Sequence, residues 1–355
     1  MSQAIDLTVS KKLRNMAALS AVMVCFIHVG ILRGNDISVS VLWFHRVFSA
    51  SICKIAVPFF FLAAGYFIAG HMWEDNWWRR EVAKRVKTLL VPLLVWNFVM
   101  FMWNIGYDCL ANLLRYHVFE INLGDDVFDT LLRLFGLQLF KQPYHGILWF
   151  LRALFVLCVL SAFFKRIACW SAVLALYLAY GINYPDYVGE MSPREFFFHE
   201  GPISLFGATY FLCGICLRVQ KINLIMSRNK GLACLVGGIG LVFIKWFFAL
   251  NGALKLTAIA GWLSIPLLLS AVWWLCPVNP VIGSEYSFAV YILHVFWLSA
   301  IGRCARIIGF NVFPVQGLAN YLFLSLLIYV ASWMSAIVLR KIAPRFYNLL
   351  FGARG

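Results

Sequence analysis

Runs of about 20 apolar residues recur along the whole chain and are separated by short polar breaks. A helical run of this length crosses the roughly 30 Å hydrocarbon core of a bilayer. The composition agrees, because 63% of the 355 residues are hydrophobic and only 13% are charged, about half the charged fraction of a water-soluble domain. The sequence therefore predicts an all-α membrane protein, and it excludes soluble, disordered and disulfide-rich secreted folds.

We predict one transmembrane domain over residues 1–355, built as a polytopic bundle of about ten membrane-spanning helices. These helices fall near residues 13–32, 52–70, 88–107, 146–164, 167–183, 203–219, 230–250, 256–276, 285–303 and 316–339. The first run is full length, so we expect it to remain as an anchor rather than to be cleaved as a signal peptide. The two longest outer segments, about 108–145 and 182–202, hold most of the outer acidic residues. Their aromatic side chains suit either a polar ligand or the membrane interface.

The basic residues are distributed unevenly between the two sides of this predicted bundle. If the N-terminus lies in the cytoplasm, most of the 30 Lys and Arg residues fall on the inner side, while the acidic residues concentrate outside. This positive-inside pattern predicts that both termini are cytoplasmic. Topology and contact with anionic membrane lipid then account for the formal charge of +15, so no nucleic-acid partner is expected.

Ionisable side chains inside apolar spans are costly and are therefore functional candidates. His28 follows Arg14 by fourteen residues, which places it about 21 Å further along the first helix and on nearly the same face. A neutral imidazole can accept a proton from an alcohol at pH 7. His28 is therefore a candidate general base, and a histidine hydrated at the outer interface is the alternative.

A second candidate cluster lies in the ninth predicted span. Ser287, Tyr291 and His294 are spaced by four and three residues, so they share one stripe of a helix. His294 falls near the bilayer centre, where an imidazole needs a partner. The pair Tyr291 and His294 either belongs to a reaction site or forms a hydrogen bond that joins helices of the bundle.

Four further residues mark the outer ends of the second and fourth spans. Lys54 lies four residues before Pro58, where its side chain can extend to the interface. Arg152 lies about 10 Å inside the fourth span, which is a deeper and more costly position. His145 and Trp149 stand at the entrance of the same span, where Trp is commonly an interfacial anchor.

A basic run from Arg79 to Lys87 leads into the third span on the inner side and includes Arg80 and Arg85. Such a run can bind the phosphates of an anionic donor, or it can contact lipid headgroups. Cys213 and Cys216 form a Cys-x-x-Cys pair inside an apolar span without His or acidic companions, so we interpret them as packing residues. No metal site is expected.

Several of these segments, in this order, resemble the acyltransferase-3 family of bacterial integral membrane O-acyltransferases. The likeness covers most of the chain and rests on Leu13–Ala18 with Phe26–His28, Val57–Tyr66, the basic run to Pro92, Leu148–Leu151 and Ser287–His294. The family usually places ten residues between an Arg and the His of the first helix. Here thirteen separate Arg14 from His28, Ala17 occupies the usual Arg position, and Ala64 replaces the Ser of the motif Pro-Phe-Phe-x-x-Ser-Gly-Tyr.

The resemblance implies transfer of an acyl group, commonly acetyl, from a cytoplasmic acyl-CoA such as acetyl-CoA to a hydroxyl of a cell-surface or lipid-linked glycan. It also implies a multi-pass protein of the bacterial cytoplasmic (inner) membrane. His28 acts either as the general base or through a transient acyl-histidine. The expected helpers are Tyr291 and His294 beside His28, Arg14, Arg80 and Arg85 at the coenzyme phosphates, and Lys54, His145, Trp149 and Arg152 at the acceptor.

Two other classes of function remain open on the sequence. A carrier or flippase for a lipid-linked glycan or a small anion would use the same buried charges as a transport path. Transporters often have internal repeats and helices broken near the midplane; here Pro266 is the clearest mid-span proline, and no repeat is visible. A noncatalytic membrane subunit would leave the buried titratable residues without a role.

Overall fold

A computed structural model of the chain describes residues 6–29, 39–116, 126–138, 141–182, 193–279, 281, 283–307 and 317–352. Every regular element within these residues is a helix. The elements are α1 (Leu7–Val29), α2 (Val39–Phe44), η1 (His45–Ile52), η2 (Cys53–Ile55), α3 (Ala56–Ala69), α4 (Trp77–Arg85), η3 (Val86–Leu90), α5 (Val91–Tyr116), α6 (Val127–Leu134), η4 (Gly146–Leu148), α7 (Trp149–Val159), α8 (Ser161–Arg166), α9 (Trp170–Ile182), α10 (Pro193–His199), α11 (Leu205–Val219), α12 (Arg228–Leu250), α13 (Leu254–Leu275), η5 (Ser284–Tyr286), α14 (Ser287–Ile307), α15 (Leu318–Ile342) and α16 (Pro344–Phe351).

In the described part of the chain, seven helical stretches are long and apolar enough to cross a membrane. They are Leu7–Val29, Val39–Ala69, Trp77–Leu114, Arg228–Leu250, Leu254–Leu275, Ser284–Ala305 and Leu318–Ile342. Three shorter apolar helices, Gly146–Val159, Trp170–Ile182 and Leu205–Val219, occupy the other predicted segments. The all-helical membrane fold is thus confirmed. Within the described residues seven stretches have the length of a full span, so the predicted count of about ten spans is not confirmed.

The structure also moves several predicted boundaries. The third apolar stretch begins at Trp77 instead of residue 88, because the basic run is helical and continues directly through η3 into α5. The predicted outer segment 108–145 contains the end of α5 and the whole of α6. α8 ends at Arg166 and α9 begins at Trp170, so a short non-helical connection lies where the sequence predicted the tight break between the fourth and fifth spans.

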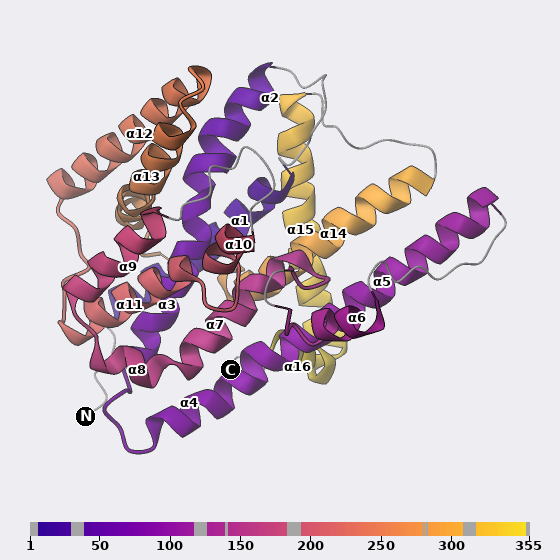
Figure 1. The fold of residues 1–355 in the computed structure, drawn as a ribbon, viewed down its shortest axis with the longest axis horizontal. Coiled ribbons are helices and arrows are strands. Elements are labelled where there is room, and N and C mark those ends of the chain that lie inside the picture. Colours follow the sequence, from indigo (N-terminus) through magenta and orange to yellow (C-terminus); the bar gives the residue numbers. More distant parts are fainter. Residues whose placement is uncertain are drawn as a thin grey trace.

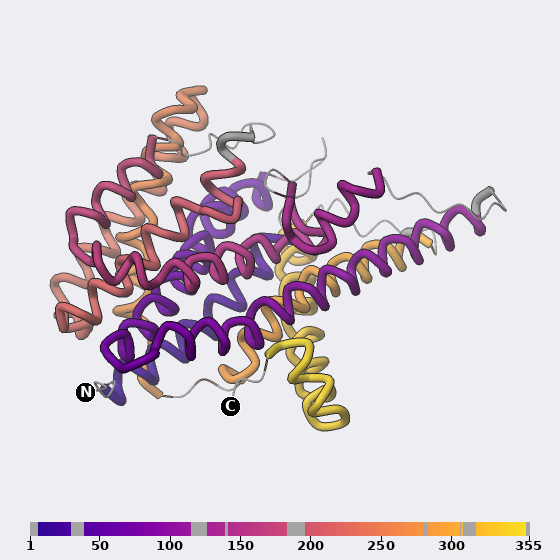
Figure 2. The backbone as a smooth tube through the Cα atoms, turned by 60° about the horizontal axis from the view of Figure 1, so that its bottom comes forward, coloured from indigo at the N-terminus to yellow at the C-terminus, as the bar shows by residue number. Residues whose placement is uncertain are grey.

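The long helices stand side by side around α1, which packs against α3, α14 and α15. Figures 1 and 2 show the α12–α13 hairpin along one edge of the bundle and the rod formed by α4, η3 and α5 along another. α16 folds back against α5. This arrangement places the C-terminal end of α1 and the middle of α14 in the protein interior.

α3 and α11 pack unusually closely because each contributes a glycine at the crossing. A Cβ atom built on Gly65 would lie 2.0 Å from the carbonyl oxygen of Phe211, and one built on Gly214 would lie 2.0 Å from that of Leu62. Small residues allow this approach of helix backbones in membrane bundles. The contact fixes α3 against α11, and α3 carries Phe60, which packs on Phe150 of α7.

A π-helical segment, η1, precedes α3 and breaks the regular α-helical hydrogen bonding. Lys245 of α12 binds to this segment. Its Nζ donates to the carbonyl oxygen of Ala50 at 2.9 Å and to Ser51 Oγ at 3.0 Å. Ser51 in turn donates to the carbonyl oxygen of Arg46 at 2.8 Å. Lys245, which falls inside a predicted span, is therefore accommodated by the polar groups that the π-helix exposes.

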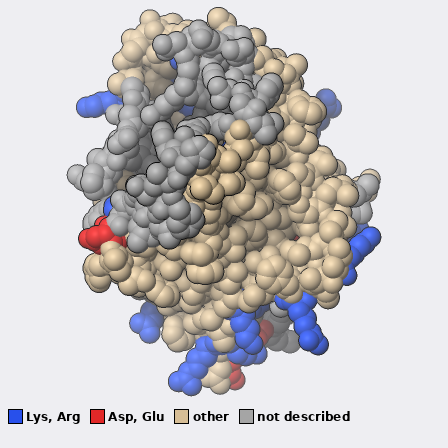
Figure 3. Space-filling model, turned by 90° about the vertical axis from the view of Figure 1, so that its right-hand side faces the viewer, with Lys and Arg blue, Asp and Glu red and all other residues tan. Residues whose placement is uncertain are grey.

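Charged side chains are distributed unevenly over the surface. On the face drawn in Figure 3, the described residues in the centre form a broad area without Lys, Arg, Asp or Glu, and several Lys and Arg side chains gather along the lower rim. An uncharged band bordered by cationic side chains is typical of a membrane-embedded surface.

Candidate active site

Three histidines from separate parts of the chain meet inside the bundle. His28 lies in the last turn of α1 and is partly buried, whereas His294 in α14 and His145 before η4 are fully buried. The ring centroids of His28 and His294 are 5.0 Å apart, with their planes inclined by 46°. His145 lies within electrostatic range of both rings. The structure therefore brings together His28 and His294, which the sequence placed in different helices, and adds His145.

Backbone carbonyl groups define the tautomers of two of these rings. His294 Nδ1 lies 2.6 Å from the carbonyl oxygen of Tyr291, and His145 Nε2 lies 3.1 Å from that of Ile292. A carbonyl oxygen can only accept, so each of these nitrogens carries the proton of the neutral ring. The other nitrogens, His294 Nε2 and His145 Nδ1, are buried without a hydrogen-bond partner among the described residues. Each ring thus retains a buried basic nitrogen that can accept a proton or a hydrogen bond.

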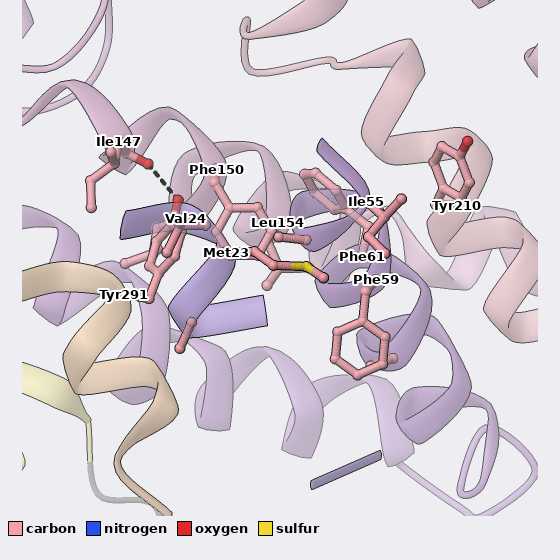
Figure 4. Close-up of a cluster of buried hydrophobic side chains, with 14 of the residues drawn as sticks. Met23, Val24, Ile55, Phe59, Phe61, Ile147, Phe150, Leu154, Tyr210 and Tyr291 are labelled. Carbon is pink, nitrogen blue, oxygen red and sulfur yellow. Dashed lines mark hydrogen bonds between the residues drawn. The ribbon is translucent and has the colours of Figure 1, made fainter. Parts of the chain in front are cut away.

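Tyr291 is held rigidly next to His294. Its hydroxyl donates to the carbonyl oxygen of Ile147 at 2.9 Å, the bond drawn as a dashed line in Figure 4. Its ring packs against Phe60 at 5.8 Å and against Phe150 at 5.3 Å between centroids. Because Ile147 belongs to η4, this bond ties α14 to the segment that carries His145. Tyr291 and His294 are brought to the site as one unit.

Asn97 in α5 supports the same segment, although the sequence did not single it out. Its Oδ1 accepts from the backbone N–H of His145 at 3.3 Å, and its Nδ2 donates to the carbonyl oxygens of Arg133 and Leu134 at 2.7 and 2.6 Å. The ring of Trp96 lies edge-on to His145, with centroids 6.0 Å apart. A polar Asn inside an apolar run was the signal that could have revealed this position.

A second polar cluster lies around Glu200, just after α10. The Glu200 carboxylate accepts a hydrogen bond from the Gln142 amide. The Arg152 guanidinium donates to the carbonyl oxygens of Gly136, Gln138 and Glu200. These hydrogen bonds to backbone carbonyl oxygens offset part of the free-energy cost of burying the Arg152 charge. Glu200 and Gln142 are further residues of the site that the sequence did not identify.

The carboxylate of this cluster also interacts electrostatically with Tyr291, which lies next to His294. Lys54, in η2, is within electrostatic range of Glu200, and the Glu200 carboxylate also acts on Tyr291. Burial raises the pKa of the Glu200 carboxyl, and the Gln142 hydrogen bond and the charges of Lys54 and Arg152 oppose that rise. The charges of Lys54 and Arg152 thus both act on this one carboxyl.

His199 and Trp149 border the cluster on the side of α9. Their ring centroids are 6.1 Å apart, and His199 stacks on Tyr180 at 5.8 Å. Burial, together with the charge of Lys54, lowers the pKa of His199 to about 3. Trp149 also contacts Phe61 and Phe150, so its ring faces the bundle interior in addition to marking the entrance of α7.

On the opposite end of α1, Arg14 is exposed and its neighbour Asn15 is the buried polar residue. Asn15 Nδ2 donates to the carbonyl oxygens of Pro277 and Asn279 at 2.7 Å each, and Asn15 Oδ1 accepts from the N–H of Val281 at 3.0 Å. The structure therefore separates Arg14 from the histidine site along the helix and leaves its guanidinium on the surface.

Two of the three arginines of the basic run, Arg80 and Arg85, have acidic partners. Arg80 is exposed and pairs with Glu74 at 2.8 Å. Arg85 is largely buried and pairs with Glu81 at 2.5 Å, and Glu81 also contacts His71 at 3.0 Å. Both arginines belong to the α4 segment, which lies at the lower end of the bundle in Figure 1.

Among the described residues, His, Cys, Asp and Glu side chains do not gather in groups of three that could hold a metal ion. The described polar groups instead supply basic nitrogens, cations and carbonyl dipoles. Such groups can move a proton and hold an anion or a hydroxyl group.

Comparison with known proteins supplies the class of reaction. A family model described as an acyltransferase domain, Acyl_transf_3, matches residues 12–337, nearly the whole chain. No curated protein and no solved structure gives a significant match. The matched region contains most of α1, the three histidines and the Glu200 cluster. The chain therefore belongs to the acyltransferase-3 family and is a multi-pass membrane acyltransferase.

Proposed function

We propose that the protein transfers an acyl group, most simply acetyl, from cytoplasmic acyl-CoA to a hydroxyl group of a cell-surface or lipid-linked glycan. The single observation that carries the proposal is the pairing of a partly buried His28 with a fully buried His294, 5.0 Å apart, inside an acyltransferase domain. One ring of this pair is accessible and the other is enclosed by protein. A reactant hydroxyl can therefore approach His28 but not His294.

In the proposed reaction, His28 acts as the general base. Its unprotonated ring nitrogen takes the proton of the acceptor hydroxyl, and the oxygen attacks the thioester carbonyl carbon. The tetrahedral intermediate collapses, the carbon–sulfur bond breaks, and the coenzyme thiolate receives the proton from the His28 imidazolium. In the alternative sequence, the His28 nitrogen attacks the thioester first, and the acceptor hydroxyl then removes the acyl group from the histidine.

His294 and Tyr291 serve as positioning residues in this proposal. The free Nε2 of His294 can accept the N–H of His28, which directs the other His28 nitrogen towards the acceptor hydroxyl. The carbonyl bond to Nδ1 supports this role because it holds the proton on the far side of the His294 ring. His145 also has a buried nitrogen without a hydrogen-bond partner among the described residues, and it lies within electrostatic range of His294.

The acceptor and donor would approach from different sides. We assign Lys54, His145, Trp149 and Arg152, together with Glu200, to the acceptor at the predicted outer side. Lys54 and Arg152 act on the Glu200 carboxyl, and Trp149 lies against His199. His145 is within electrostatic range of His28 and His294. We assign Arg14, Arg80 and Arg85 to the phosphates of acyl-CoA at the predicted cytoplasmic side. Arg80 and Arg85 would exchange their carboxylate partners for phosphate oxygens, which favour bidentate pairing with arginine.

The proposed location is the bacterial cytoplasmic membrane, with both termini in the cytoplasm. The gathering of Lys and Arg side chains along one rim of the molecule supports this orientation. It places the basic run where acyl-CoA is available and the Glu200 cluster where a surface glycan or its lipid-linked precursor is available.

Replacing His28 with Ala tests the proposal directly. We expect acyl transfer to fall by roughly 10²-fold to 10⁴-fold, the usual contribution of general base catalysis, with unchanged expression and melting temperature. The measurement is consumption of radiolabelled acetyl-CoA by purified protein in detergent, with and without candidate acceptor glycans.

The matched control is His45→Gln, which alters a partly buried histidine of η1 outside the site and should leave the rate near that of the wild type. Near-wild-type transfer by His28→Ala would remove His28 from the chemistry. Transport of the glycan without thioester consumption would identify a carrier instead.

A further inference from the structure

A cleft of about 410 Å³ opens where the turn after α3 meets the beginning of α4 and the end of α8. Its volume falls within the roughly 300–1,000 Å³ of small-molecule sites. Figure 1 shows α4 and α8 together at the lower end of the bundle, the end that also carries the basic run. The lining residues are Trp73, Trp77, Trp78, Ala162, Lys165 and Arg166.

Two of the three indoles are fixed in the protein, and the third is presented to solvent. Trp77 is buried, and Trp78 Nε1 donates to the carbonyl oxygen of Val159 at 2.8 Å. Trp73, in the turn between α3 and α4, is 63% exposed. An exposed indole of this kind is a stacking surface for a planar base.

Cations line the same cleft. Lys165 Nζ donates to the carbonyl oxygen of Met72 at 2.6 Å and lies 4.3 Å from the centre of the Trp73 ring. Arg166 is exposed, and its guanidinium forms no hydrogen bond or ion pair within the part of the chain that the structure describes. The nearby carboxylate of Glu74 is occupied by Arg80. The cleft therefore offers an unpaired guanidinium, that of Arg166, beside the exposed Trp73 ring. Of the two neighbouring acidic residues, Glu74 is paired with Arg80, and only Asp75 lacks an ion-pair partner among the described residues.

We propose that this cleft binds the adenosine bisphosphate portion of the acyl-CoA donor. The adenine ring stacks on Trp73, and the phosphates pair with Arg166 and the Lys165 ammonium. A phospholipid headgroup shares the phosphate but has no planar base, so it would use the two cations and leave the Trp73 surface unoccupied. The proposal rests on the proposed function, and it places donor recognition on α8 and the α3–α4 turn in addition to Arg14, Arg80 and Arg85.

A binding experiment separates this site from the chemistry. Adenosine 3′,5′-bisphosphate, which lacks both pantetheine and thioester, is titrated by calorimetry into protein in phosphatidylcholine nanodiscs. We expect Trp73→Leu to weaken binding by about tenfold, as loss of one base–aromatic stack does, and Arg166→Gln to weaken it by a similar factor. Trp73→Phe retains an aromatic face and should bind within about threefold of the wild type.

Trp170→Leu is the matched control, because Trp170 is an exposed indole of the neighbouring helix α9 that bonds to Gln220 outside the cleft. Its affinity should equal that of the wild type. Equal affinity of Trp73→Leu and wild type overturns the proposal. Displacement of the nucleotide by inorganic phosphate, or by phosphatidylglycerol vesicles, at matched phosphate concentration overturns it too, because the cleft would then recognise phosphate alone.

Steady-state kinetics distinguish failure of this inference from failure of the proposed function. A raised KM for acetyl-CoA in Trp73→Leu with unchanged kcat supports the cleft as the donor site. Unchanged KM with normal transfer refutes the cleft and leaves the function intact. Trp73-dependent nucleotide binding by a wild-type protein that transfers no acyl group refutes the function and leaves the nucleotide site.

Discussion

Burial determines the protonation of His199, which lies at the end of α10 between Tyr180 and Trp149. The imidazolium is disfavoured there, so the pKa of His199 in the folded protein is about 3, against about 6.5 for an exposed histidine. Above pH 6.5 both states hold a neutral ring, and His199 has no effect on the pH dependence of stability. Below pH 6.5 the unfolded chain binds the proton and the folded protein does not, so stability falls until the pH reaches about 3.

His199→Gln should therefore reduce the acid sensitivity of the protein. Between pH 7 and pH 5 we expect the wild type to lose about 2 kcal/mol of unfolding free energy through this residue, and the variant to lack that part. The measurement is the melting temperature in detergent at the two pH values. Tyr180→Phe is the control, because it removes the hydroxyl near His199 Nδ1 but keeps the imidazole. If both variants lost the same acid sensitivity, packing rather than titration of His199 would be responsible.

The first helix shows where reasoning from single residues succeeds and where it stops. The sequence correctly marked His28 and His294 as ionisable residues inside apolar helices, since lipid makes such residues costly. It also singled out Arg14, whereas the side chain that enters the interior at that end is Asn15. Adjacent residues of a helix point about 100° apart, so the neighbours of the helix determine which of them is buried.

At the scale of elements, the α3–α11 contact is the tightest point of the bundle near the site. Gly65 and Gly214 each face a backbone carbonyl of the other helix. The motif Val57–Tyr66 ends with Gly65-Tyr66, and the structure explains the glycine by this close approach. Ala64, which replaces the family's Ser, is only partly buried and takes no part in that carbonyl contact.

Gly214→Ala should separate the two helices. Its new methyl group would lie 2.0 Å from the carbonyl oxygen of Leu62, so backbone must move, at a cost of about 1–3 kcal/mol or more. We expect a lower melting temperature and, because α3 carries Phe60 beside Tyr291, a reduced rate of transfer. Gly240→Ala in α12 is the control, since nothing lies within 4 Å of its built Cβ. Equal stability of the two variants would show that α3 and α11 can move apart without a loss of unfolding free energy.

For the whole molecule, the orientation in the membrane can be tested at a natural thiol. Cys169 is exposed in the break between α8 and α9, and hydrogen bonding to the Ser171 hydroxyl lowers the pKa of its thiol. A lowered thiol pKa increases the reactive thiolate fraction at neutral pH. In a Cys304→Ser background, we expect a membrane-impermeant maleimide to label Cys169 in inside-out vesicles and not in right-side-out vesicles, as read by mass shift.

The opposite face provides the control. Val127, at the beginning of α6, is 67% exposed, and Val127→Cys in a Cys169→Ser, Cys304→Ser background should label from right-side-out vesicles only. Labelling of Cys169 from the outer side would reverse the orientation. The basic run and the Trp73 cleft would then lie outside the cytoplasm, where acyl-CoA is absent.

The sequence by itself determined that this chain is a helical membrane protein, because the length of an apolar run and the cost of unpaired backbone groups in lipid fix that outcome locally. It also identified the costly ionisable residues His28, His294 and Arg152. Only the tertiary structure decided that His145 and Asn97 join them, that Glu200 lies beside Lys54, and that several apolar helices are shorter than a full span. Those facts depend on how each helix is rotated and shifted against its neighbours. Close contacts between helices, such as that of Gly65 with Phe211, determine this placement, and the sequence of one helix does not contain it.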